Sequence, residues 1–118
     1  MSHEVKEVRV FSRPAAAVLA LASDVAAQLG GKRPKNAAGD CVTADFNKQI
    51  GGRAFGNRVQ IVVRVTVDGP DRCAAHVEAY PIDPLGNRLR FGVLGDPARL
   101  VTVAFWEQLE ARITSAAR

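Results

Sequence analysis

The stretch Arg58-Val-Gln-Ile-Val-Val-Arg-Val-Thr-Val-Asp68 alternates apolar and polar side chains except at Val62. Side chains of a β-strand point alternately to the two faces of a sheet, so a period of two predicts a strand with one buried face. The buried face would carry Val59, Ile61, Val63, Val65 and Val67. The other face would carry Arg58, Gln60, Arg64, Thr66 and Asp68.

Further strands are predicted on both sides of this segment, since similar alternation recurs there between turn-forming residues. A turn at 68–71 leads into a returning strand over 72–80, and a connection over 81–87 leads into another strand over 88–94. Two earlier strands are predicted over 5–11 and 41–48. The segment 50–57 contains three glycines, opens no helix and lacks the Gly-Lys-Ser/Thr ending of a phosphate loop, so a connection between strands is favoured. An anion contact by Arg53 and Arg58 stays open as the alternative.

Two helices complete the pattern. The first begins near Ser12-Arg13-Pro14 and ends at Gly30-Gly31, and its apolar stripe is Val18, Leu21, Val25 and Leu29. The second begins with Asp96 as its cap and Pro97 in its first turn, and its stripe is Val101, Phe105, Leu109 and Ile113. Trp106 falls beside this stripe and is expected to be partly exposed or at an interface. The predicted fold is α+β, in the order β-α-β-β-β-β-α: an antiparallel sheet of four to five strands with two helices packed on one face.

The strand register follows from the need to keep apolar side chains on one face across each hairpin. A three-residue loop at 69–71 pairs Val67 with Cys73, Val65 with Ala75 and Val63 with Val77. The same reasoning for the next hairpin pairs Ala79 with Leu89, Val77 with Phe91, Glu78 with Arg90 and Tyr80 with Arg88. The opposite, open face would then present a polar group: Arg58, Gln60, Arg64, His76, Glu78, Tyr80, Arg88 and Arg90.

Length and composition are those of one globular domain spanning residues 1–118, with 47% apolar and 24% charged residues. The formal net charge is +4, and twelve of the sixteen basic residues are arginines, which suit carboxylates and phosphates. No apolar segment is long enough to cross a membrane, so no membrane partner is expected. The charged N-terminus is unlike a signal peptide, and we expect a cytoplasmic protein whose two cysteines are free.

Two clusters resemble chemical sites. Cys73-Ala-Ala-His76 has the look of half a zinc site, but in a strand these two side chains point to opposite faces, so neither a metal site nor a cofactor is expected. His76, Glu78, Tyr80 and Arg64 share the open face, where little burial is available to shift their pKa values. Solvated cross-strand pairs explain them better than general acid–base catalysis does. The sequence therefore assigns no catalytic residue and favours a noncatalytic role, with enzyme activity left open.

From Val8 to Gly31 the chain resembles the opening of a helix-grip domain of the START-like superfamily, which includes polyketide cyclases and lipid-transfer proteins. The resemblance lies in a first strand followed by Arg13-Pro14-Ala15-Ala16-Ala17-Val18, and in a long closing helix over 96–116. It implies a curved antiparallel sheet and a ligand cavity beneath the closing helix. The strand order also resembles one half of the TATA-binding-protein fold, which presents an open sheet to nucleic acid.

Three functions follow as hypotheses. The first is a small noncatalytic binding module that works through its open face as a homo-oligomer, with site residues Arg58, Arg64, His76, Tyr80, Arg88 and Arg90. The second is a helix-grip carrier of a small apolar or anionic ligand or a lipid, or a cyclase-type enzyme, with its pocket beneath Phe91 and Phe105. The third is nucleic-acid binding through the arginines Arg53, Arg58, Arg64, Arg88 and Arg90.

Overall fold

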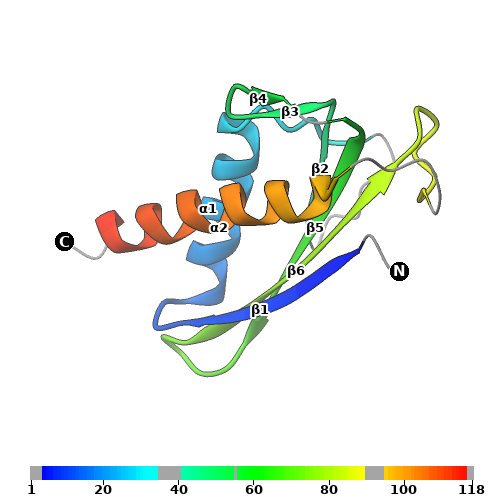
Figure 1. The fold of residues 1–118 in the computed structure, drawn as a ribbon. Coiled ribbons are helices and arrows are strands. Elements are labelled where there is room, and N and C mark those ends of the chain that lie inside the picture. Colours follow the sequence, from blue (N-terminus) through cyan, green and yellow to red (C-terminus); the bar gives the residue numbers. More distant parts are fainter. Residues whose placement is uncertain (1–3, 35–40, 55, 90–94, 117–118) are drawn as a thin grey trace.

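A computed structural model describes residues 4–34, 41–54, 56–89 and 95–116. One antiparallel sheet has the strand order β1-β6-β5-β2, formed by Val5–Phe11, Cys73–Ile82, Arg58–Val67 and Val42–Phe46. A small second sheet pairs β3 (Gln49–Ile50) with β4 (Arg53–Ala54). Helices α1 (Ala15–Gln28) and α2 (Pro97–Ala116) both lie on one side of the larger sheet (Figure 1). The predicted fold class and element order are confirmed.

The central hairpin has the register that the alternation predicts. Val63 pairs with Val77, Val65 with Ala75 and Val67 with Cys73. The Asp68 N–H donates to the Arg72 carbonyl at 2.9 Å, which leaves residues 69–71 as the three-residue loop. The open-face partners Gln60–Tyr80 and Arg64–His76 also lie opposite each other as expected.

The core lies between the sheet and the helices. From β5, Val59, Ile61 and Val63 are fully buried, and all four residues of the predicted α2 stripe are buried. From α1, Val18 and Val25 are fully buried, while Leu21 and Leu29 are partly buried against the same core. Helix α2 begins as predicted, since the Arg99 N–H donates to the Asp96 carboxylate. Among the described helices, none is long and apolar enough to cross a lipid bilayer.

Val67 does not share the burial of its neighbours, although the alternation places it on the inner face. Its side chain is 75% exposed. Its partner Cys73 on β6 is fully buried, whereas β2 pairs with β5 only as far as Val63, so Val67 lies beyond the end of β2 near the hairpin turn. The alternation gives the face of a side chain correctly, but burial also requires an element packed above it.

The pairing predicted between β6 and the strand over 88–94 is not found at Arg88 and Leu89. The proposed pairings of Ala79 with Leu89 and Val77 with Phe91 are wrong, because β1 occupies that side of β6 and pairs Val5 with Ala79 and Glu7 with Val77. Strand β6 instead continues to Ile82, which bridges Arg88, and the Leu89 N–H donates to the Pro81 carbonyl. Residues 90–94, and with them Arg90 and Phe91, lie outside the described residues.

Trp106 is 2% exposed, so the expectation of a partly exposed indole is wrong. Two charged residues of β1 enclose it, because Glu7 and Arg9 point to the helix-covered face of this edge strand. The indole Nε1 donates to Glu7 Oε1 at 2.9 Å, and the Arg9 guanidinium lies over the ring at 4.7 Å. Arg9 also pairs with Glu110, and Glu7 with Arg99, so α2 is tied to β1 by ion pairs as well as by apolar packing.

Glu7 makes stability dependent on pH. Partial burial raises the pKa of its carboxyl, but the hydrogen bonds from Arg99 and Trp106 and the nearby positive charges outweigh this and bring the pKa below the ordinary 4.5. A carboxyl whose pKa is lower in the folded state stabilises the fold above its unfolded pKa. That contribution is lost as the pH falls through the folded pKa.

We therefore predict that Glu7→Ala lowers the free energy of unfolding by about 1–2 kcal/mol near neutral pH, because the buried indole N–H loses its acceptor. Glu7→Gln keeps an acceptor and loses only the charge, so its loss is smaller, about 0.5–1 kcal/mol, and disappears in acid. Urea unfolding followed by the fluorescence of Trp106, the chain's one tryptophan, measures both. Glu107→Ala is the control, because Glu107 is exposed on α2, the helix that carries Trp106. Equal losses at all pH values for Glu7→Gln would contradict the charge-based account.

Candidate functional site

The open face of the sheet carries most of the predicted site residues. Arg58, Gln60 and Arg64 of β5 lie on it beside His76, Glu78 and Tyr80 of β6. Arg88 reaches it from the segment after β6. Three groups were not singled out from the sequence: Lys6, Val8 and Val10 of β1, Thr43 and Asp45 of β2, and Val62 of β5.

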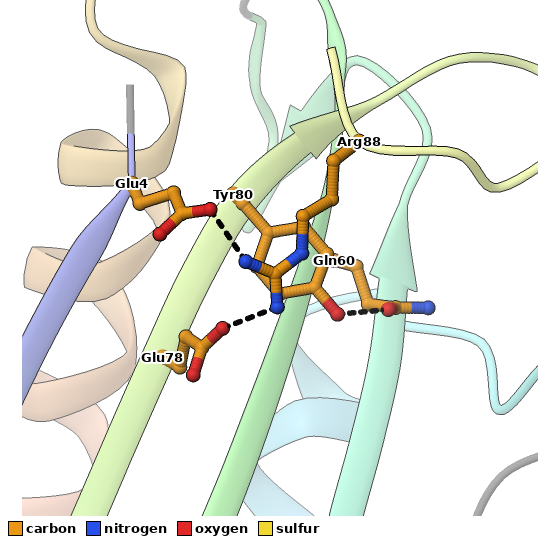
Figure 2. A network of polar contacts seen from close by, with 5 residues as sticks. All are labelled: Glu4, Gln60, Glu78, Tyr80 and Arg88. Atoms are coloured by element: carbon orange, nitrogen blue, oxygen red, sulfur yellow. Dashed lines mark hydrogen bonds and ion pairs between the residues drawn. The ribbon is translucent and has the colours of Figure 1, made fainter. Parts of the chain in front are cut away.

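A chain of polar contacts crosses this face from Glu4, just before β1, to Asp45 of β2, and Figure 2 shows its part from Glu4 to Gln60. Arg88 donates to both Glu4 and Glu78, and its guanidinium stacks over the Tyr80 ring at 3.9 Å. The Tyr80 hydroxyl donates to Gln60 Oε1. The Gln60 amide then donates to Asp45 Oδ1 at 2.8 Å. We call Glu4, Arg88, Glu78, Tyr80, Gln60 and Asp45 the polar chain.

The contact between Tyr80 and Arg88 forms although the register predicted for it is wrong. Arg88 bridges Ile82 and not Tyr80, which shifts the pairing by two residues and keeps the face unchanged. Burial opposes the charge of Arg88, but the hydrogen bonds and charges of Glu4 and Glu78 outweigh burial and raise its pKa. Its charge is therefore held by two carboxylates and one aromatic ring.

A groove of about 700 Å³ lies beside the polar chain, over β2 and β5. Its floor includes Thr43, Asp45 and Gln60, and its ends carry Arg58 and Arg64. The wall is the loop 83–87, which is held by the Asp83 carboxylate. This carboxylate accepts hydrogen bonds from the backbone N–H groups of Asn87 at 2.9 Å and Leu85 at 2.8 Å, and these bonds lower the pKa of Asp83.

Arg58 and Arg64 differ from the other arginines of this face. Among the residues that the structure describes, neither has an ion-pair or hydrogen-bond partner. They stand six positions apart on one face of β5, which separates their Cα atoms by about 20 Å at ~3.3 Å per residue. The groove therefore has a positive charge at each end, and the polar groups between them include the negatively charged Asp45 carboxylate.

The predicted set of His76, Glu78, Tyr80 and Arg64 does not converge on one point. His76 is exposed, and its Nε2 lies 3.2 Å from the Thr66 hydroxyl. Glu78 is paired with Arg88, and the Tyr80 hydroxyl is bonded to Gln60. A second hollow of about 320 Å³ lies between β1, β6 and β5, lined by His76, Arg64 and Val8 among others. These contacts join neighbouring segments of the face, but Tyr80 is only 7% exposed, so the expectation that little burial is available on this face is wrong for Tyr80.

The two cysteines lie apart, as the strand alternation predicts. Cys73 is fully buried on the helix-covered face, where burial raises the pKa of its thiol, and His76 is exposed on the other face. Cys41 lines the groove beside Thr43, and both thiols are free. Within the described ranges, no three His, Cys, Asp or Glu side chains are grouped as metal ligands.

The glycine-rich segment predicted as a connection forms the β3–β4 hairpin. Gly51 and Gly52 have φ values of 54° and 85°, which other residues rarely adopt, and they make its turn. The Gly51 N–H donates to the Leu29 carbonyl at 3.0 Å, which ties this hairpin to the end of α1. Arg53 is exposed on it, away from the residues that line the groove.

Sequence reasoning missed the residues of β2 that complete the groove. The alternation of 41–48 already placed Cys41, Thr43 and Asp45 on the face opposite Phe46. What it did not indicate is that β2 lies next to β5, since that neighbour relation depends on pairing distant segments. No family model, curated protein or solved structure matches the chain.

Tyr80 is the protein's one tyrosine, so the titration of its phenol reports directly on the polar chain. Burial raises the pKa of the Tyr80 phenol above its ordinary 10.0, and the charge of Arg88 offsets part of the rise. We predict that Arg88→Met, which keeps cover over the ring and removes the charge, raises this pKa further. An ultraviolet titration of the phenolate checks it, with Arg72→Met on the distant hairpin as control. A fall in the phenol pKa of Arg88→Met would contradict the stacked geometry.

Proposed function

We propose that the protein is a noncatalytic binding module that takes an anionic ligand in the groove of its open face and works as a homo-oligomer. The main observation in support is the pair of arginines, Arg58 and Arg64, at the two ends of a groove of about 700 Å³. Ligand sites of proteins commonly measure about 300–1,000 Å³. Guanidinium groups are well suited to carboxylates and phosphates, which they bind in a bidentate geometry.

The separation of the two arginines favours an elongated ligand with an acidic group at each end. Between them the groove offers the Thr43 hydroxyl, the Gln60 amide and the Asp45 carboxylate as hydrogen-bonding groups. Gln60 is already oriented by Tyr80 on one side and Asp45 on the other. A floor whose side chains are held in place loses little conformational freedom when a ligand binds.

A noncatalytic role is supported by how the titratable groups are used. Glu78 is engaged in an ion pair with Arg88. The Tyr80 phenol has a raised pKa and donates to Gln60, so it is not poised to exchange protons near neutral pH. His76 stands on the exposed part of the face, outside the groove. Binding needs only charge and shape, which the groove offers.

Two other functions stay as alternatives. A helix-grip carrier of the START-like type would need an apolar cavity beneath α2, whereas Phe105 and Leu109 are fully buried in the core on that side. Nucleic-acid binding would use Arg53, Arg58, Arg64 and Arg88, of which Arg53 lies on a separate hairpin and Arg88 is neutralised by Glu4 and Glu78. Both facts favour the groove proposal over these two.

The test is a titration of the full chain with a panel of anions: inorganic phosphate, dicarboxylates of increasing length, nucleotides and a single-stranded oligonucleotide. Nuclear magnetic resonance of the arginine side chains follows Arg58 and Arg64 directly. We predict that at least one elongated dianion shifts both signals and that Arg58→Gln/Arg64→Gln weakens its binding about tenfold or more, since each charged hydrogen bond contributes ~1.5–3 kcal/mol.

Arg72→Gln is the matched control, because this exposed arginine lies on the hairpin tip and pairs with Asp68. Its affinity should equal that of the wild type. If all anions leave the Arg58 and Arg64 signals unchanged, the groove proposal is wrong. Tighter binding of the oligonucleotide that weakens steeply with salt would favour the nucleic-acid alternative.

A further inference from the structure

Among the described strands, β1 is an edge of the larger sheet, and its outer backbone groups can be assigned. In an antiparallel pair, backbone hydrogen bonds join alternate residues. The bond from Asp68 N–H to the Arg72 carbonyl shows that even-numbered residues of β5 and β6 face each other, and Leu89 donating to Pro81 shows odd-numbered residues of β6 facing the other side. Val5, Glu7, Arg9 and Phe11 pair with odd-numbered residues there. The backbone groups of Lys6, Val8 and Val10 therefore point outward.

We infer that a second copy of this chain pairs with that edge, β1 against β1, with Val8 facing Val8 of the other copy across a two-fold axis. This inference rests on the homo-oligomeric part of the proposed function and names its surface. The two four-stranded sheets would join into one continuous sheet. Free strand edges offer unpaired N–H and C=O groups, and pairing satisfies them.

Charge complementarity selects this register. With Val8 on the axis, Glu7 of each copy faces Arg9 of the other, and Val5 faces Phe11. Moving the axis to Glu7 sets two carboxylates opposite each other, and moving it to Arg9 sets two guanidinium groups opposite each other. Like charges directly across a strand pair are unfavourable. A register shifted by one residue would place helix-covered side chains of one copy opposite open-face side chains of the other copy.

The exposed apolar side chains of β1 also favour a second copy of this chain as the partner. Val8 is 56% exposed and Val10 51% exposed, and both lie on the open face. In the proposed register Val8 meets its own symmetry mate, and Val10 lies beside the alkyl stem of Lys6. Glu7 and Arg9 keep their contacts with α2 while facing the opposite charge of the partner, since their side chains are 32% and 41% exposed.

The other edge of the sheet is less available. On β2, Asp45 exchanges backbone hydrogen bonds with Lys32, at 2.9 Å from Lys32 N–H and 2.8 Å from Asp45 N–H. A two-fold axis at β1 would also place the grooves of both copies on the same face, at the far ends of the joined sheet. A dimer of this kind would bind two ligands, or one partner carrying two acidic groups.

The first arm of the test is solution mass, measured by light scattering over a series of protein concentrations. We predict that the wild type reaches the mass of a dimer and that Val8→Lys raises its dissociation constant about tenfold or more, because two lysines then face each other across the axis. Val67→Lys is the control, since Val67 is exposed on the hairpin tip and lies away from the edge. Circular dichroism verifies that both variants are folded.

The second arm tests the register by disulfide formation in a Cys41→Ser background, where the remaining Cys73 is fully buried. Hydrogen-bonded pairs of an antiparallel sheet have Cα atoms about 5.5 Å apart, within the range of a disulfide. Val8→Cys should therefore cross-link with itself. Lys6→Cys and Val10→Cys should cross-link only when the two variants are mixed.

A wild type that stays monomeric at every concentration overturns the inference, and so does a dimer that Val8→Lys leaves equally tight. Cross-linking of Lys6→Cys or Val10→Cys alone overturns the register. The anion titration repeated on Val8→Lys separates this inference from the groove. If the monomeric Val8→Lys variant keeps its anion affinity per chain, the groove binds its ligand without the edge pairing. If Arg58→Gln/Arg64→Gln loses anion binding but remains a dimer, the edge pairing forms without ligand binding in the groove.

Discussion

The pairing of β5 with β6 is the constraint on which the rest of the molecule depends. It sets Val63 against Val77 under the helices and, one position along, Arg64 against His76 on the open face. A slip of one residue would bury the arginine and expose the valines, at a cost that no other contact of the sheet could offset. Because the core fixes this register, the arginines of β5 are held on the open face, where the side chains of Val8 and Val10 also lie.

Charge is used differently on the two faces of the sheet. On the helix-covered face, Glu7 and Arg9 stand at the margin of the core, and each is satisfied by a charged residue of α2 and by the indole of Trp106. Partly buried charges are tolerated when their hydrogen bonds are made. On the open face, Arg88 is neutralised by two carboxylates, whereas Arg58 has no partner among the described residues. The groove is thus the place on the open face where a described arginine lacks a carboxylate partner.

The candidate site was predictable in part. The residues of β5 and β6 followed from alternation, because a hairpin with a three-residue loop has only one register that keeps apolar side chains together. The contact of Arg88 with Tyr80 was predicted with a wrong pairing, and the face was still correct because the shift was by two. The groove itself was not predicted, since it depends on β2 lying beside β5 and on the loop that Asp83 holds in place. Both relations depend on contacts between distant segments, and the sequence of one segment does not indicate which other segment it contacts.

Local periodicity in the sequence determined the fold class, the two helices with their apolar stripes, and the face to which each strand residue points. These properties depend on backbone geometry alone, which repeats every two residues in a strand and every 3.6 in a helix. Only the tertiary structure decided that β1 occupies the edge beside β6, that Trp106 is buried beneath charged residues, and that Val67 is left uncovered. Burial depends on which element lies above a side chain, and that is set by packing between distant segments.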